Sequence, residues 1–178
     1  MKRLFTAVVV AAVLAGCSTT VPVNYVPSPS MRGEGAVSVG QFVYAPAQRG
    51  EVKPNQFQPS PGGALGSMYL SETVDELLKD ALVKELIAAG FNPEDTSGLQ
   101  ITGTVDRFIY DWVGFVEMDM YMDVSYTVKK GDEVVYQGVK KTHKALPKAV
   151  GYDSVAVNSV LSDNISQLLR DLRSKKLI

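Results

Sequence analysis

Acidic side chains recur along one stretch of the sequence at a spacing that could do chemistry. Glu117, Asp119 and Asp123 lie an even number of residues apart, and Asp106 and Asp111 precede them. In an extended strand, such positions share one face. Neighbouring carboxylates on a face can bind a hard cation or serve as an acid and a base. The alternative is the solvated face of a half-buried sheet, which we favour because calcium sites more often use loops that wrap oxygens around the ion.

Methionines alternate with these acids. Met118, Met120 and Met122 recur at every second position. Thioethers are soft ligands that suit Cu(I), so the three side chains could form a copper-binding surface. The same face also carries Val116 and Val124, and its apolar character favours packing in a core beneath helices.

The single histidine has no partners in any recognisable catalytic pattern. His143 follows two lysines and a threonine, and Lys144 comes next. No cysteine, serine or acid is spaced with it as in a nucleophilic site. We interpret His143 as a solvated residue near a strand end, with a pH-sensing contact as the alternative.

Three aromatic side chains cluster around a predicted turn at 111–114. They are Tyr110, Trp112 and Phe115. They could plug the end of a hydrophobic core. An exposed tryptophan at a hairpin tip would instead be a contact point for a partner or a membrane surface.

Composition excludes several classes of protein. The chain has 178 residues, is 46% hydrophobic and 21% charged, and carries a formal net charge of −1. These values suit one globular domain and exclude a collagen-like chain, a disulfide scaffold and a basic nucleic-acid binder. One histidine excludes a multi-histidine metal site within one chain. The sequence has no G-x-S-x-G, P-loop or dinucleotide motif, so we expect no enzyme, no cofactor and no resident metal.

The first residues have the order typical of an export signal. Met1-Lys2-Arg3 is basic, and Leu4–Leu14 is an uncharged, mostly apolar run. The run is too short to span a bilayer but suits the core of a signal peptide. Ala15 and Gly16 are small, and the only cysteine, Cys17, follows them.

The segment Leu14-Ala15-Gly16-Cys17 resembles the lipobox of bacterial lipoproteins. The resemblance implies removal of residues 1–16 as a signal peptide, diacylglycerol on the Cys17 sulfur, and acylation of the new amine, for example by palmitate. Two or three acyl chains anchor a protein stably, whereas one chain is marginal. In a Gram-negative bacterium, with its two membranes, the resemblance implies a lipoprotein of the cell outer membrane that faces the periplasm.

Two proline-rich segments interrupt the mature chain. Residues 17–35 comprise the lipidated cysteine and a predicted flexible tether, because Pro22, Pro27 and Pro29 leave little periodicity. The globular domain is expected to occupy 36–178 and to begin with a strand over 36–45. The following loop, Pro46–Gly63, is predicted to be mobile and dispensable for folding.

The remaining elements follow from periodicity. Residues 71–89 and 154–173 repeat apolar side chains at helical spacing, and Gly90 predicts the end of the first helix. The strands are predicted at 99–110, with a bulge near Asp106 or Arg107, at 115–129 and at 133–143, with a short additional strand at 64–70. The order β-α-β-β-β-α predicts an α+β two-layer sandwich. Its sheet is mixed but mostly antiparallel, with two helices on one face and a parallel crossover around the first helix.

The last helix carries a second resemblance. Its segment Ala156–Ile165 (AVNSVLSDNI) is similar to the last helix of YajG-type outer-membrane lipoproteins, and Leu86–Phe91 (LIAAGF) fits the same layout. Other small envelope lipoproteins, including auxiliary lipoproteins of lipid-transport systems, share this plan. The resemblance implies fold and location more than mechanism.

These patterns lead to two hypotheses on function. In the first, the protein is a non-enzymatic, lipid-anchored adaptor or auxiliary subunit of an envelope complex, held to the membrane by its N-terminal lipid. Its partner surface would be the wet sheet face, with the Pro46–Gly63 loop as a second surface. In the alternative, the protein binds a lipid or another small envelope ligand in a cleft between sheet and helices. The residues expected at the partner surface are Trp112, Glu117, Asp119, Tyr121 and Asp123.

Overall fold

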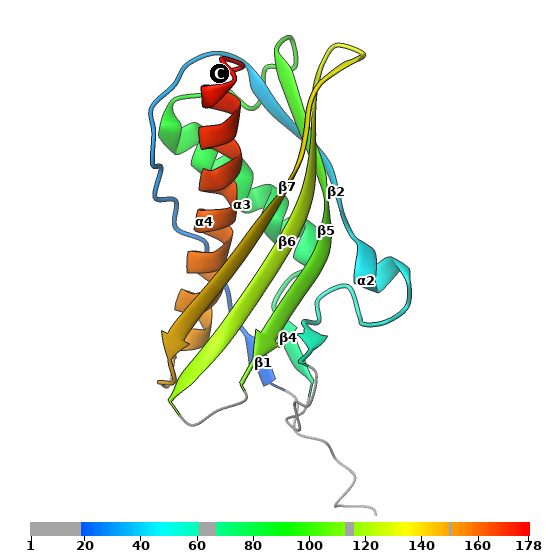
Figure 1. Ribbon diagram of the computed structural model, residues 1–178, viewed down its shortest axis with the longest axis vertical. Helices are drawn as coiled ribbons and strands as arrows, with labels where there is room; N and C mark the ends of the chain where they lie inside the picture. The colour runs from blue at the N-terminus through cyan, green and yellow to red at the C-terminus, as the bar shows by residue number, and fades with distance from the viewer. Residues whose placement is uncertain (1–18, 61–66, 113–115, 150) are drawn as a thin grey trace, which may run out of the picture.

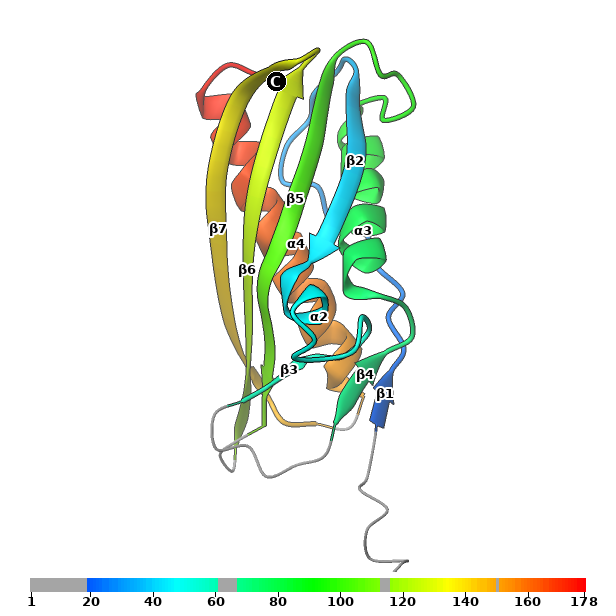
Figure 2. The ribbon, with the colours of Figure 1, turned by 90° about the vertical axis from the view of Figure 1, so that its right-hand side faces the viewer.

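The protein is built as a twisted sheet with two long helices across one of its faces (Figures 1 and 2). The computed structural model describes residues 19–60, 67–112, 116–149 and 151–178. The predicted signal peptide and Cys17 therefore lie outside the described residues. The helices α3 (Val74–Ala89) and α4 (Tyr152–Ser174) form the second layer. The predicted α+β two-layer sandwich is confirmed.

The main sheet has five strands, in the order β2-β5-β6-β7 with β3 beside β5. β2 and β5 are parallel and enclose α3 in sequence, so the predicted parallel crossover is confirmed. β5, β6 and β7 form an antiparallel meander. The strands run over Val37–Tyr44 (β2), Gln58–Pro59 (β3), Leu99–Asp111 (β5), Glu117–Lys130 (β6) and Glu133–Pro147 (β7).

Two details of this sheet follow directly from the sequence pattern. The register between β5 and β6 shifts between Val105 and Arg107, which confirms the predicted bulge. The end of α3 is set by Gly90, whose φ of 103° is a left-handed conformation that glycine adopts without strain. At the other end of α3, the Thr73 hydroxyl donates a 2.9 Å hydrogen bond to Glu76, although neither side chain caps the backbone.

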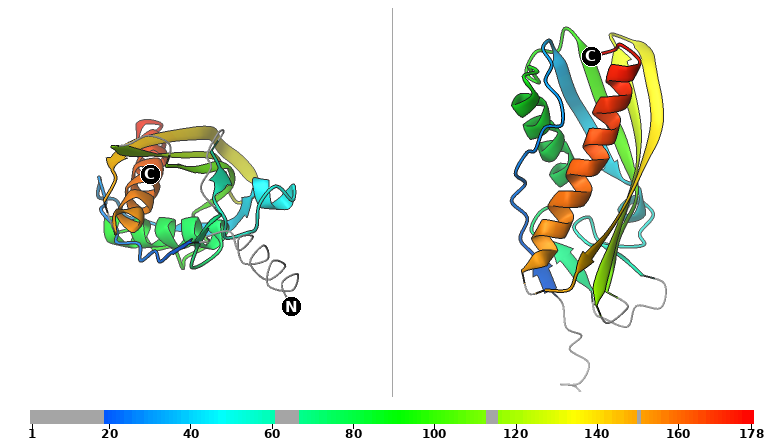
Figure 3. Two further views of the ribbon diagram at one scale, coloured as in Figure 1. Left: turned by 90° about the horizontal axis from the view of Figure 1, so that it is seen from below. Right: turned by 60° about the vertical axis from the view of Figure 1, so that its left-hand side comes forward.

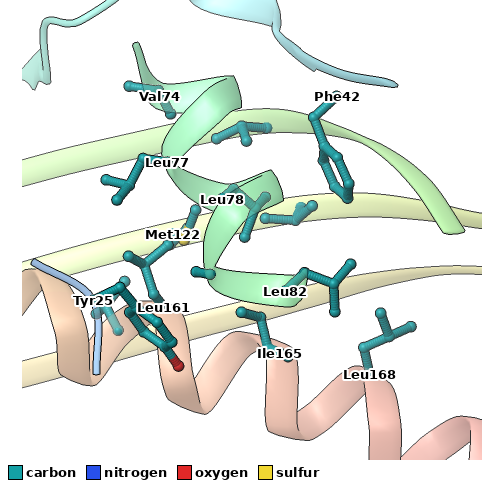
Figure 4. Packing of buried hydrophobic residues seen from close by; sticks show 14 of the residues in the cluster. Tyr25, Phe42, Val74, Leu77, Leu78, Leu82, Met122, Leu161, Ile165 and Leu168 are labelled. Carbon is teal, nitrogen blue, oxygen red and sulfur yellow. The ribbon is translucent and has the colours of Figure 1, made fainter. Parts of the chain in front are cut away.

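The hydrophobic core fills the space between the sheet and the helices. Met118, Met120 and Met122 are fully buried on the inner face of β6, which confirms the core-packing interpretation over the copper-binding surface. Val116 was expected on the same face but is 74% exposed, because it precedes the first residue of β6. Figure 4 shows side chains of α3 and α4 packed together in the core with Met122 of β6: Leu77, Leu78, Leu82, Leu161, Ile165 and Leu168.

The proline-rich segment before β2 is packed against the domain, which corrects the expectation of a flexible tether. Thr19–Val21 forms a strand, β1, parallel to β4 (Met68–Leu70). The rest of the segment, to Gly35, runs beside α3 and α4 in an extended path (Figure 3). Val21 and Tyr25 are buried in the core, so their apolar side chains hold down a backbone that the prolines keep extended. We call residues 19–35 the strap.

The segment expected to be a mobile loop, Pro46–Gly63, is also ordered up to Ser60, which corrects a second expectation. Its prolines permit structure because Pro46 stands in the first turn of a short helix, α2 (Ala45–Gln48), where its missing N–H costs nothing. Phe57 is buried, with its ring centre 4.7 Å from that of Phe108. The Gln58 side chain accepts a 2.9 Å hydrogen bond from the Phe108 N–H. Residues 61–63 of the segment, and 64–66 of the predicted additional strand, lie outside the described residues.

Replacing Gly50–Gln58 with a short Gly/Ser linker is therefore expected to destabilise the fold. The replacement removes Phe57 from the core, and truncating a buried phenylalanine costs about 3–5 kcal/mol. Denaturant unfolding would measure the loss. The control is the double variant Arg49→Ser, Glu51→Ser, which removes an exposed ion pair and should change stability by less than about 1 kcal/mol. An unchanged unfolding midpoint in the linker variant would contradict the anchoring role of Phe57.

Candidate interaction surface

The sheet face opposite the helices carries the sequence-predicted site residues. Odd-numbered side chains of β6 point to this outer face, while the even-numbered ones from Met118 to Val128 are buried. Glu117 is exposed, and Asp119, Tyr121 and Asp123 are half-buried. They are not fully solvated because β6 is a central strand, flanked by the side chains of β5 and β7. Figure 2 views this face of the three strands, with α4 behind it.

Four side chains from three neighbouring strands meet on this face, and we call them the Tyr121 cluster: Arg107, Asp119, Tyr121 and His143. The Arg107 guanidinium carbon lies 4.4 Å from the centre of the Tyr121 ring. The His143 ring stacks on Tyr121, with a centroid separation of 4.4 Å and an interplanar angle of 3°. His143 Nε2 lies 2.6 Å from Asp119 Oδ1. Cation–π, stacking and hydrogen-bond contacts thus hold the cluster together.

His143 is exposed to solvent, as expected, but it has an acidic partner and does not lie at a strand end. β7 continues to Pro147, so His143 lies within the strand and directly opposite Tyr121. Its side chain is 52% exposed and Asp119 is 29% exposed, so the pair is accessible from solvent. Arg107 also belongs to the cluster but was not among the predicted site residues.

The carboxylates near the Tyr121 cluster have different partners and do not converge on one point. Asp106 accepts a 2.5 Å hydrogen bond from the Ser125 hydroxyl, whereas Asp119 contacts His143. Asp123 lies opposite Arg107 on one side and Lys141 on the other. Among residues 19–60, 67–112, 116–149 and 151–178, no group of three or more His, Cys, Asp and Glu side chains could hold a metal ion.

Trp112 lies at one end of the sheet rather than within the Tyr121 cluster. Its ring stacks on Tyr110, with centroids 5.8 Å apart, and the Lys148 ammonium lies 4.7 Å from the centre of the indole. Tyr110 donates a hydrogen bond to Asp153, and burial, followed by this bond, raises the pKa of its hydroxyl. Trp112 is partly buried, as an aromatic plug would be; Phe115 lies outside the described residues.

In the described part of the chain, buried side chains and a buried polar network lie between the sheet and the helices. Asn164 of α4 is fully buried; its side-chain oxygen accepts a 2.8 Å bond from the Tyr126 hydroxyl. Its amide donates to the Thr142 hydroxyl and to the Lys140 carbonyl, each at 3.1 Å. A groove of about 350 Å³ lies elsewhere, at the β2 edge, where Val39 and Phe42 meet the charged side chains of Asp75, Glu76 and Lys79.

The strap is held by a buried carboxylate that the sequence analysis did not identify. Glu85 of α3 is 1% exposed. Its Oε1 accepts a 2.5 Å hydrogen bond from the Tyr25 hydroxyl and a 2.9 Å bond from the Ser28 N–H. The Asn24 carbonyl of the strap also accepts a 3.3 Å hydrogen bond from the Asn158 side chain of α4. Burial, reinforced by the bond to Glu85, raises the pKa of the Tyr25 hydroxyl, which therefore stays protonated and remains a donor.

Tyr25→Phe is expected to lower the free energy of unfolding by about 1–3 kcal/mol, because the buried Glu85 carboxylate loses a donor. Chemical denaturation would measure the change, and limited proteolysis within residues 19–35 would show whether the strap has loosened. Tyr152→Phe is the matched control, since Tyr152 is an exposed tyrosine, and it should change stability by less than about 0.5 kcal/mol. Equal stability of the two variants would rule out Glu85 as the attachment point.

Comparisons with known proteins place the fold. No protein-family model matches the sequence, and no curated protein matches it. Among solved structures, the chain is similar to a protein from Xanthomonas campestris described with the family model DUF330. The TM-score is 0.56 at 16% sequence identity, over 90% of this chain and 95% of that one. At this identity the similarity shows a shared fold alone.

Two further structural neighbours are more distant. A hypothetical protein from Chlamydia trachomatis has a TM-score of 0.49 at 8% identity, over 79% of this chain and 96% of that chain. A minor lipoprotein from Acinetobacter baumannii has a TM-score of 0.41 at 10% identity, over 80% of this chain and 94% of that chain. These scores are too low to carry an argument, so the YajG-type resemblance stays a prediction. No helix in the described part of the chain is long and apolar enough to cross a membrane.

Proposed function

We propose that this protein is a lipid-anchored lipoprotein of the outer membrane that faces the periplasm and acts by protein–protein contact, as an adaptor or auxiliary subunit. The anchor is supported by the order of charge, apolar run, small residues and Cys17 at the N-terminus. The similarity of the last helix to YajG-type lipoproteins supports the same location.

The observation that carries the adaptor role is the Tyr121 cluster. It presents a planar aromatic ring, an arginine and a histidine–carboxylate pair from three hydrogen-bonded strands. Aromatic and arginine side chains on a rigid support are the residues that dominate binding at protein interfaces. The half-exposed cluster can therefore contact a partner without first rearranging the sheet.

The same cluster supports a non-enzymatic role. A histidine–aspartate pair contributes to nucleophilic catalysis when the histidine reaches a nucleophile. Here the contacts of His143 are Asp119 at Nε2 and the stacked Tyr121 ring, neither of which is a nucleophile, and the nearby Ser125 hydroxyl is bonded to Asp106. The alternative, a binder of a lipid or small ligand between sheet and helices, is less well supported because, in the described residues, core side chains fill that space.

Cys17→Ser is expected to abolish lipidation and move the protein out of the membrane fraction, because the thiol is the acceptor of the diacylglycerol group. Cell fractionation and mass spectrometry of the mature protein would show both effects. Ser18→Ala is the control and should leave fractionation and mature mass otherwise unaffected. Unchanged membrane fractionation of the Cys17→Ser variant would overturn the anchor.

Tyr121→Ser is expected to reduce the recovery of cross-linked partners from intact envelopes, because it removes the ring between Arg107 and His143. Thr127→Ser, a milder change on the same face of β6, should recover the partners that the wild type recovers. Circular dichroism would establish that both variants are folded. A folded Tyr121→Ser variant that retains every partner would overturn the assignment of this surface.

A further inference from the structure

The end of the domain that carries β1 combines exposed apolar side chains with a very short connection to Cys17. Figures 1 and 2 show that β1, the start of β6 and the start of α4 lie at this end, opposite the C-terminus. We call the exposed residues Val116, Tyr152 and Val155, together with the partly buried Trp112, the basal patch. From these observations we infer that the basal patch rests on the lipid surface of the leaflet that holds the Cys17 acyl chains. This inference rests on the proposed lipid anchor.

The first argument is the length of chain available. The strap is fixed to the domain from Thr19, whose N–H bonds the Ser67 carbonyl at 3.3 Å. Two residues of fully extended chain span at most about 7 Å. Once Cys17 is acylated, its sulfur lies at the level of the lipid glycerol groups. The fixed strap therefore keeps the β1 end of the domain at the membrane, where a free tether of residues 18–35 would have let it move away.

The second argument is the composition of the patch. Val116 is 74% exposed, Val155 is 50% exposed and Tyr152 is 44% exposed. Single exposed apolar residues are ordinary, but here they gather at the end nearest the anchor. Tyrosine and tryptophan, with an apolar body and a polar tip, suit the boundary between lipid headgroups and acyl chains. Membrane contact would remove this apolar surface from water.

The third argument is that the patch is rigidly assembled. The Lys148 N–H donates a 2.9 Å hydrogen bond to the Val116 carbonyl, which joins the end of β7 to the start of β6. Tyr110 bonds Asp153 in the first turn of α4, and Trp112 stacks on Tyr110. The patch is therefore presented as one unit by β5, β6 and α4.

The charges around the basal patch indicate whether the patch would recognise anionic lipid headgroups or the apolar part of the membrane. Glu117, Asp111 and Asp153 lie beside the patch, together with Lys148. A mainly acidic surround gives no attraction to anionic headgroups. The contact is therefore apolar, and it should form on zwitterionic lipid and respond little to salt.

Trp112 is the only tryptophan in the chain, so its fluorescence reports on this end of the domain. The lipidated full-length protein would be reconstituted into phosphatidylcholine vesicles with or without bromine on the acyl chains near the headgroups. We expect the brominated lipid to quench Trp112 emission, with little effect of added salt. Lipidated protein whose emission is not quenched would overturn the inference while leaving the anchor intact. Absence of acyl groups in the mature mass would instead overturn the proposed anchor.

Two double variants distinguish the effect of the basal patch from the effect of the short connection to Cys17. Val116→Asp with Val155→Asp should reduce the quenching while lipidation is retained. Ile87→Asp with Val134→Asp, at exposed apolar positions toward the opposite end, should quench like the wild type. Equal quenching of all three proteins would show that the connection alone holds the domain there, and would overturn the patch. Concentration-dependent dimers with unquenched Trp112 would assign the patch to a second copy of the chain and likewise overturn the inference.

Discussion

The structure depends on the two-faced character of its central strand. β6 pairs along its length with β5 on one side and β7 on the other, so its two faces must meet different surroundings. Its inner face, with Met118, Met120 and Met122, lies in the core, where α4 packs against β6 and β7 and α3 packs mainly against β2. Its outer face supplies Asp119 and Tyr121 to the cluster. Because side chains alternate strictly, a register shift of one residue would bury the carboxylates and expose the methionines.

This alternation explains why much of the fold could be predicted. Apolar periodicity is strong in β6, α3 and α4, and each of these elements lies close to its predicted range. The break of phase near Asp106 correctly predicted the bulge in β5. In each case the signal is local, since it depends on which face of one element is buried.

The Tyr121 cluster could not be predicted in the same way, because it depends on pairing between strands. From the turn, Lys130 lies opposite Glu133, and an unbroken register would set Thr142 opposite Tyr121. The shift between Val128 and Lys129 sets His143 there instead. The strap and Phe57 were missed for a related reason: proline and glycine describe a segment's own backbone, whereas Val21, Tyr25 and Phe57 are held by distant parts of the core.

The attachment of the strap also constrains the order in which the molecule can be completed. Tyr25 bonds Glu85 of α3, and the Asn24 carbonyl accepts a hydrogen bond from Asn158 of α4, so the binding site of the strap is made by elements that come much later in the chain. Because the chain is made from its N-terminus, the strap stays undocked until the last helix, α4, has been made and has packed. Closing that long separation in sequence is entropically slow compared with forming the β6–β7 hairpin. The strap is thus made early but is among the last segments to reach its final place. It docks on the domain only when synthesis has ended.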